Sequence, residues 1–236
     1  STFISMNKGR SGTSSLCDSN NSLLLYAGYL SDGTSQTRCR VYNKFHTKVL
    51  NGDSIFFEPW YHSILFVPKP SSDSIAFLFS NIVVGEIDPF GLYYSIINYK
   101  ANNDSGLVVQ KNVQLNNRPA FDGLAAIKHG NGKYWWVIFK DWNPLSLLTY
   151  NNRFHVYLVN ENGPILFQTQ NIGVMNNDGG GQLLFNESGS LLYLCTWAGA
   201  LEYLSFDRCT GQLSNPIIVE QPHSTQPYPY YASLAL

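Results

Sequence analysis

The sequence of 236 residues is poor in charged side chains and has almost no net charge. Lys, Arg, Asp and Glu make up 13% of the chain, and their formal sum is −1 at pH 7. This balance provides no electrostatic field for capturing nucleic acid or an anionic membrane surface. We therefore expect no nucleic-acid partner.

Long apolar runs and regular helical patterns are also missing. No apolar run approaches the ~18 residues that a membrane helix needs, and the N-terminal STFISMNKGRSG lacks the apolar core of a signal peptide. No stretch combines sustained helical periodicity with capping residues. We expect no membrane insertion, and the α/β fold classes are disfavoured.

Motifs for metal, phosphate and serine chemistry are absent as well. The histidines form neither HxH nor HExxH, the cysteines form no CxxC pair, and neither a DxDxDG loop nor a GxSxG elbow occurs. Gly179-Gly180-Gly181 precedes an expected strand, so it lacks the helix N-terminus that would hold phosphate. The sequence predicts neither a metal site nor a cofactor.

The four cysteines are Cys17, Cys39, Cys195 and Cys209. They leave two interpretations open. Small buried side chains are favoured over disulfides, because the spacings fit no recognisable framework. If disulfides form, four cysteines allow three pairings, and the sequence does not choose among them.

Aromatic and turn-forming residues are abundant, and they follow a repeat. Aromatics make up 14% of the chain, with scattered Gly and Pro, which favours an all-β domain. Four segments read as strand, polar turn and strand: TSSLCDSNNSLLLYAG, SILFVPKPSSDSIAFLF, LAAIKHGNGKYWWVIF and LLFNESGSLLYLCTW. Their equivalent turn residues, Asn21, Asp73, Gly132 and Gly189, are 52, 59 and 57 residues apart.

A second strand pair follows each hairpin, with polar or glycine-containing turn residues in the middle. Four strands per unit at a period of ~40–60 residues are typical of a β-propeller blade. A β-sandwich also uses many short strands but requires no such period. The sequence therefore predicts an all-β propeller of four-stranded antiparallel blades, with approximate bounds 13–52, 63–115, 124–170 and 181–220.

The C-terminal segment 231–236 reads as the first strand of a further blade. Four blades and one strand would form part of a larger ring, with open edges near Ile4–Arg10 and Ala232–Leu236. Open sheet edges invite pairing with other strands. We expect these edges to be covered by further blades of a parent chain or by a second copy.

Several segments carry a resemblance to a known group of proteins. FNESGSLLYLC resembles the strand–turn–strand core of WD-type propeller repeats. FDRCTGQLSNPI resembles the outer hairpin of that repeat in secreted surface proteins of gliding and related bacteria of the Bacteroidota. The resemblance implies a propeller carried by a cargo of type IX secretion, with a role in adhesion or as an extracellular scaffold.

Three carboxylates and several aromatics precede the expected innermost strands, where propellers bind ligands. The carboxylates are Glu58, Asp122 and Asp178, and a pair of carboxylates is what a glycosidase requires. Polar turns also favour Asp, so position alone does not establish catalysis. The aromatics proposed as ligand contacts are Trp60, Tyr61, Phe121, Tyr228 and Tyr230, and packing between blades is the competing interpretation for them.

Two functional hypotheses follow from these residues. The favoured one is a non-catalytic module that binds protein or glycan on a secreted or cell-surface bacterial protein. The alternative is a propeller glycoside hydrolase that uses Glu58, Asp122 and Asp178. A hydrolysis screen with Asp122→Asn separates the two.

Overall fold

The fold is an all-β propeller arrangement of four antiparallel sheets, which confirms the predicted fold class. The computed structural model describes residues 12–29, 38–58, 60–83, 89–142, 151–176, 178–223 and Leu234. The strands of the first two sheets are β1 (Thr13–Cys17), β2 (Leu23–Tyr29) and β3 (Cys39–Asn43), then β4 (Ile64–Pro68), β5 (Ile75–Ile82), β6 (Gly91–Asn98) and β7 (Leu107–Asn116). The last two sheets comprise β8 (Ala120–Lys128), β9 (Trp135–Asp141), β10 (Asn151–Asn160) and β11 (Gly163–Asn176), then β12 (Gly181–Phe185), β13 (Leu191–Thr196), β14 (Leu201–Phe206) and β15 (Leu213–Glu220).

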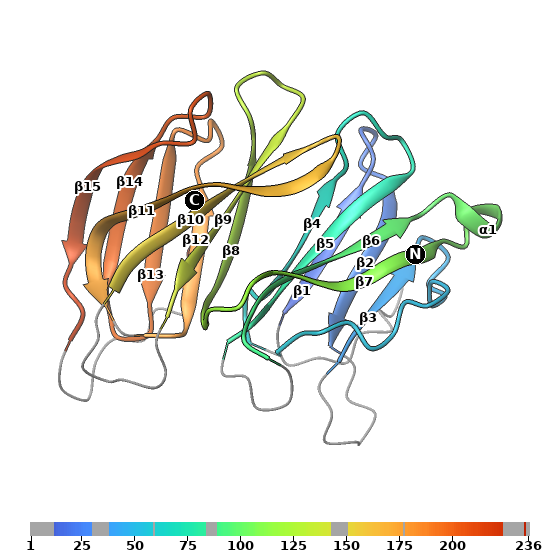
Figure 1. Cartoon of the computed structure of the whole chain (residues 1–236), viewed down its shortest axis with the longest axis horizontal. Helices are drawn as coiled ribbons and strands as arrows, with labels where there is room; N and C mark the ends of the chain where they lie inside the picture. The colour runs from blue at the N-terminus through green and yellow to red at the C-terminus, as the bar shows by residue number, and fades with distance from the viewer. Residues whose placement is uncertain are drawn as a thin grey trace.

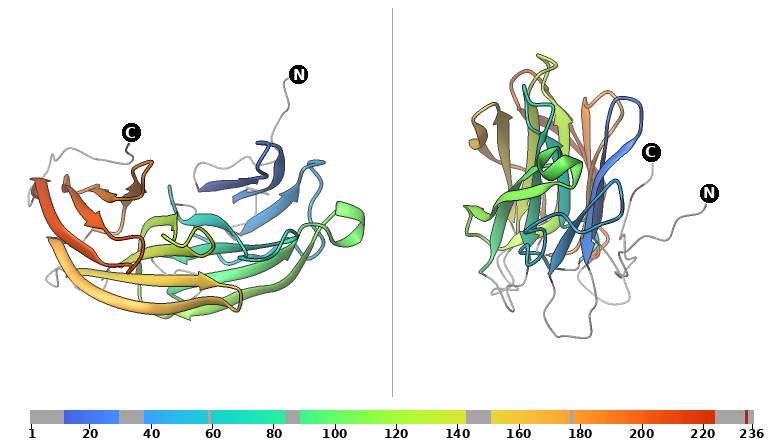
Figure 2. Two further views of the ribbon diagram at one scale, coloured as in Figure 1. Left: turned by 90° about the horizontal axis from the view of Figure 1, so that it is seen from above. Right: turned by 90° about the vertical axis from the view of Figure 1, so that its right-hand side faces the viewer.

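The four sheets, called blades 1 to 4 in chain order, follow one another along an arc (Figure 1). The first strand of each blade lies on the concave side of the arc, and the last strand lies on the convex side (Figure 2). Along the concave side, β1 packs against β4, β4 against β8, and β8 against β12. Neighbouring blades therefore meet through their innermost strands as well as through their flat faces.

Each blade begins with the hairpin that the sequence repeat predicts. The hairpins join β1 to β2, β4 to β5, β8 to β9 and β12 to β13. Their turns contain residues with positive φ, namely Asn21 at 60°, Ser71 at 59°, Gly132 at 71° and Gly189 at 72°. Turns of this kind require φ values that Gly and Asn tolerate best, and these residues occupy the position in three of the four turns, with Ser71 in the fourth.

Blade 1 departs from the four-stranded pattern on its outer side. After β3 the chain forms isolated bridges between Tyr42 and Lys48 and between Cys39 and Ile55 instead of a continuous fourth strand. His46, Asn51 and Ser54 in this stretch all have positive φ. Backbone turns at such short intervals prevent a regular extended strand.

The core consists of three layers of apolar side chains, one between each pair of neighbouring blades. Because side chains alternate along a strand, adjacent residues serve different layers. Trp136 is 1% exposed and faces blade 4, where its indole N–H donates a hydrogen bond of 2.7 Å to the Arg208 carbonyl. Trp135 faces blade 2 and is partly buried.

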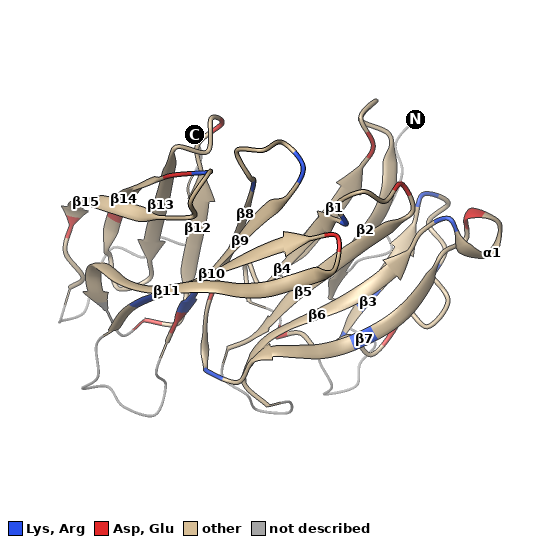
Figure 3. Ribbon diagram, turned by 45° about the horizontal axis from the view of Figure 1, so that its top comes forward, with Lys and Arg blue, Asp and Glu red and all other residues tan. Residues whose placement is uncertain are grey.

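In the part of the chain that the structure describes, helical structure is limited to the short turn α1 (Ala101–Asp104) between β6 and β7. Within the described residues, no helix has the length and apolar composition of a membrane span. Acidic and basic residues lie in small separate groups over the four blades (Figure 3), in keeping with the low net charge.

Of the expected strand 231–236, the structure describes Leu234 alone. Its backbone N–H donates a hydrogen bond of 2.5 Å to Oε1 of Gln182 in β12. The segment Ile4–Arg10 lies outside the described residues.

The four cysteines are all free thiols in two different environments. Cys39 and Cys195 are fully buried, and burial raises their pKa to about 12 and about 11, respectively. Cys17 and Cys209 are exposed. Two cysteines thus match the expectation of small buried side chains, and two do not.

This difference gives a direct test of the fold by thiol labelling. A small maleimide at pH 7 should react rapidly with the exposed Cys17 and Cys209. Cys39 and Cys195 should react only after denaturation, because the thiolate is the reactive form and burial disfavours it. Mass spectrometry of the labelled protein should show two adducts in native buffer and four in denaturant. Rapid native labelling of Cys39, which is fully buried, would contradict the packing between blades 1 and 2.

Candidate ligand-binding site

Four aromatic side chains from three blades gather at one end of the molecule. Trp60 and Tyr61 precede β4, Trp142 directly follows β9, and Trp197 directly follows β13. This is the end at which the innermost strands begin and the second strands finish. We call these four residues the aromatic cluster.

The rings of the aromatic cluster contact one another in defined geometries. Trp60 stacks on Trp197 with ring centroids 5.0 Å apart and an interplanar angle of 17°. Tyr61 meets Trp197 edge-on at 5.6 Å, and Trp60 lies tilted against Trp142 at 6.3 Å. Tyr61 is 46% exposed, so the cluster combines a packed interior with an accessible aromatic edge.

The glycine run before β12 allows two indoles to pack closely against the backbone. A Cβ atom on Gly179 would lie 2.7 Å from the Trp142 ring, and one on Gly180 would collide with the Trp197 ring. The backbone N–H of Trp197 also donates a hydrogen bond of 3.0 Å to the Gly180 carbonyl. Residues without side chains are therefore required where this loop passes the two rings.

The Asp122 carboxylate fixes the backbone that carries Tyr61. Asp122 is fully buried and accepts hydrogen bonds from the backbone N–H groups of Tyr61, at 2.9 Å, and of His62, at 3.2 Å. Its own N–H donates to the Gly179 carbonyl at 2.8 Å. Although sequence analysis placed Asp122 before an innermost strand, it lies within β8, where the pairing with β9 shifts register between Ala120 and Leu124.

The other two predicted carboxylates have similar structural partners. Glu58 is 9% exposed, and its Oε2 accepts a short hydrogen bond from the Val83 backbone N–H. Asp178 accepts hydrogen bonds from the backbone N–H groups of Gly180, at 3.1 Å, and of Ala198. All three carboxylates thus bind backbone donors of the loops at this end of the molecule.

Burial shifts the pKa of two of these acids and of the buried residues Lys140 and Glu202. It raises the pKa of Asp122 to about 7, with a further contribution from the nearby Glu58, and it also raises the pKa of Asp178. Lys140, which is fully buried, has its pKa lowered to about 8, and the buried Glu202 has its pKa raised to about 7. Desolvation is the largest cause in each case, since burial disfavours the charged form.

The structure places the aromatics proposed from the sequence in different environments. Trp60 and Tyr61 belong to the aromatic cluster. Phe121 is fully buried in the core between blades 3 and 4 and therefore offers no surface to a ligand. Tyr228 and Tyr230 lie outside the described residues.

Sequence reasoning missed Trp142 and Trp197, although a signal was present. Both follow the second strand of a blade, and they are 55 residues apart, within the 52–59 residue spacing of the turns. A search for aromatics at equivalent positions of the repeat would have found them.

Groups suited to metal binding do not occur in the part of the chain that the structure describes. There, no three His, Cys, Asp or Glu side chains gather as the ligands of an ion would.

The raised pKa of Asp122 predicts a specific pH dependence of stability. In the folded state the carboxyl keeps its proton up to about pH 7, whereas its ordinary pKa is 3.8. Between these values the folded state binds more protons than the unfolded state, so the free energy of unfolding should fall as the pH rises. With about 1.4 kcal/mol for each pKa unit, this contribution is on the order of 4 kcal/mol.

Asp122→Asn should remove this contribution, because the amide does not titrate. Urea denaturation at pH 4.5 and 7.5 should show a shallower pH dependence for the variant than for the wild type. Asp73→Asn is the matched control, since the Asp73 side chain is 87% exposed. Equal pH dependence in the wild type and Asp122→Asn would show that Asp122 does not hold its proton in the folded state.

Comparisons with known proteins leave the family of this chain open. The sequence matches no protein-family profile and no curated protein. Among solved structures, it is similar to the crystal structure of an auxiliary nutrient binding protein from Bacteroides thetaiotaomicron VPI-5482, with 14% sequence identity and a TM-score of 0.46. The match covers 92% of this chain and 44% of that one, so the chain spans less than half the length of that protein.

Proposed function

We propose that the chain is a non-catalytic binding module whose ligand contacts the aromatic cluster. The observation that carries this proposal is the gathering of Trp60, Tyr61, Trp142 and Trp197 from three blades at one end of the propeller. Partly exposed aromatic rings are effective anchors, because they provide a large apolar face with little loss of conformational entropy. A sugar ring or an apolar peptide side chain would fit such a surface.

The roles of the carboxylates support binding rather than hydrolysis. A glycosidase needs one carboxyl group as acid and another as base or nucleophile, and both must reach the scissile bond. Asp122 is fully buried and accepts two backbone N–H groups, and Glu58 accepts a third. We assign these carboxylates to positioning the loops that carry the aromatic cluster.

We place this module on a secreted or cell-surface bacterial protein with a role in adhesion or scaffolding. The support is the resemblance of its repeats to WD-type blades of surface proteins, together with the near-neutral charge of the chain. Delivery by type IX secretion belongs to the same proposal.

The flank of blade 4 that faces away from blade 3 indicates a further partner. Leu184, Tyr193 and Tyr203 are cross-strand neighbours there and are only partly buried. An apolar blade face of this kind packs against another blade elsewhere in the molecule. We propose that further blades of a parent chain or a second copy cover it.

Ligand binding at the aromatic cluster should depend on the exposed side chain of Tyr61. Tyr61→Ala should weaken binding by roughly 5- to 30-fold, as expected for an interface anchor, without changing the fold. Retardation in native gels containing soluble neutral polysaccharides such as laminarin, xyloglucan and galactomannan, together with selection from a peptide display library, identifies the binding partner. Titration followed by tryptophan fluorescence then measures affinity, since three of the five tryptophans lie in the cluster.

Phe45→Ala is the control, because Phe45 is also an exposed aromatic, at 57%, but lies in blade 1. Equal affinity of Tyr61→Ala and the wild type would contradict the proposed site. Hydrolysis of a polysaccharide that disappears in Asp122→Asn while the fold is retained would overturn the non-catalytic assignment in favour of the glycosidase.

Residues 1–236 expressed alone should associate through this outer face of blade 4. Sedimentation should show species larger than the monomer, because none of the described blades covers this apolar face. Tyr203→Arg should reduce this association, whereas Tyr134→Arg, in the β8–β9 turn, should not. A monomer that unfolds cooperatively at high concentration would show that the chain needs no partner on this flank.

A further inference from the structure

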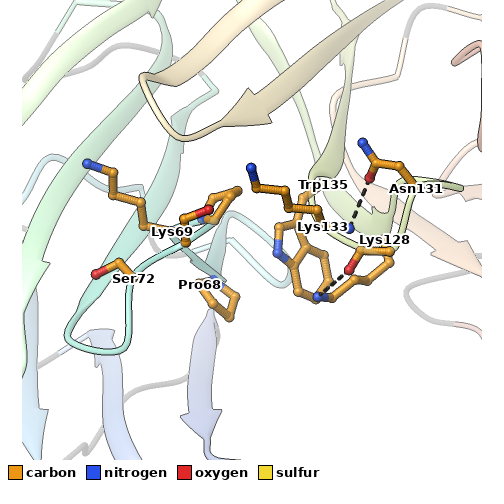
Figure 4. Close-up of a pocket in the computed structure, with 10 residues that line it drawn as sticks. Pro68, Lys69, Ser72, Lys128, Asn131, Lys133 and Trp135 are labelled. Carbon is orange, nitrogen blue, oxygen red and sulfur yellow. Dashed lines mark hydrogen bonds between the residues drawn. The ribbon is translucent and has the colours of Figure 1, made fainter.

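A second candidate site lies at the opposite end of the blades, between the first hairpins of blades 2 and 3. It is a pocket of about 500 Å³, within the usual range for small-molecule sites. Figure 4 shows Trp135 and Lys133 on one side, with Pro68, Lys69 and Ser72 on the other. The lining residues are Pro68, Lys69, Pro70, Ser71, Ser72, Lys128, Asn131, Gly132, Lys133 and Trp135.

The lining is basic in a chain whose net charge is −1. It contains Lys69, Lys128 and Lys133, and none of the described residues that line it is acidic. Lys133 lies 3.7 Å from Glu161, at the next turn of blade 3. Lys69 and Lys128 have no ion pair among the described residues. The Lys128 ammonium lies beside Trp135, whereas the Lys69 side chain starts on the opposite rim and extends away from Trp135 (Figure 4).

Besides the lysines, the pocket contains an aromatic ring, that of Trp135, and neutral hydrogen-bonding groups. The Lys128 ammonium lies 4.9 Å from the Trp135 ring centroid and donates a hydrogen bond of 3.1 Å to the Gly132 carbonyl. Asn131 Oδ1 accepts hydrogen bonds from the backbone N–H groups of Lys133 and Tyr134, which directs its amide Nδ2 away from the turn. An aromatic side chain, an amide donor and Ser71 thus line the pocket together with the lysines. The Ser72 hydroxyl accepts a hydrogen bond of 3.1 Å from the Ile75 backbone N–H within its own turn.

We propose that this pocket binds an acidic saccharide, in which a sugar unit carries a carboxylate or sulfate group. The Lys128 ammonium pairs with the anionic group, and the flexible Lys69 side chain turns toward the same group from the opposite rim. Charge-assisted hydrogen bonds of this kind are stronger than neutral ones. Trp135 offers an apolar surface for the sugar ring, and Asn131 and Ser71 can bind ring hydroxyls. Because the pocket lies between exposed turns, a polysaccharide can enter and leave it without threading into the molecule.

The test compares polymers that share a backbone but differ in charge. Dextran sulfate should bind the full chain, and uncharged dextran of equal length should not. Likewise, polygalacturonate should bind more tightly than its methyl ester, and the relative affinities of the two acidic polymers distinguish sulfate from carboxylate. The double variant Lys69→Gln/Lys128→Gln should lose at least about tenfold in affinity for the preferred acidic polymer, measured by isothermal calorimetry.

Lys44→Gln is the matched control for the loss of a lysine. Lys44 also lies over an aromatic ring, with its ammonium 5.1 Å from the Phe45 centroid, but it does not line the pocket. Unchanged affinity of the double variant, or equal binding of dextran and dextran sulfate, would overturn the proposal. Lys128 is exposed, Lys69 is half-buried, and neither has an ion pair among the described residues, so the variant should retain the wild-type thermal unfolding.

The saccharide itself is tested against another polyanion. Polyglutamate of similar charge should bind more weakly than the acidic polysaccharide, and Trp135→Ala should reduce saccharide binding more than polyglutamate binding. Equal binding of both polymers, with equal loss in Trp135→Ala, would identify a site for acidic peptides instead. Phe45→Ala, an exposed aromatic of blade 1 outside both proposed sites, should leave this binding unchanged.

Discussion

Buried carboxylates that bind backbone N–H groups of adjacent loops organise the end of this propeller that carries the aromatic cluster. Where a sheet ladder stops, the backbone donors still need partners, because an unpaired buried N–H group costs free energy. Asp122 in blade 3 accepts two such donors from the segment that leads into blade 2. A hydrogen bond from the Asp122 N–H to the Gly179 carbonyl then ties this position to the loop that leads into blade 4.

These carboxylates explain why the aromatic cluster is ordered although it lies outside the strands. Asp122 holds the backbone of Tyr61, and Asp178 holds the turn that follows Trp197. The glycines between Asp178 and β12 let the two indoles approach the backbone closely enough to pack. The resulting surface is preorganised, and preorganisation lowers the entropic cost of ligand binding. The same burial raises the pKa of Asp122, so the side chain that positions these loops also contributes to the pH dependence of stability.

The sequence predicted the features that depend on local chemistry. Turn residues with positive φ, such as Asn21 and Gly189, recur once per blade, and the period of the hairpins led directly to the propeller. The irregular outer part of blade 1 was not predicted, because the apolar pattern of residues 37–52 resembles that of a strand pair although the backbone turns at His46 and Asn51. Trp60 and Tyr61 were identified because they precede an innermost strand.

Other features depend on packing between blades and could not be derived from one unit of the repeat. Phe121 and Tyr61 occupy comparable positions in the sequence, yet one is fully buried and the other is 46% exposed. Nor did the position of Asp122 reveal that its oxygens bind backbone donors from another blade. The basic pocket joins turns about 60 residues apart, so its lysines cluster only when blades 2 and 3 pack together.

The core between blades 2 and 3 connects the two ends of the molecule. Phe77 and Phe79 of blade 2 pack there against residues of blade 3 that include Val137 and Phe139. The pocket lies across one end of this interface, and Trp60 and Trp142 meet across the other. Because packed apolar cores resist deformation, the spacing between the two sites is fixed by this layer. A long polymer or a surface with two kinds of group would therefore meet an aromatic site and a basic site at a constant separation.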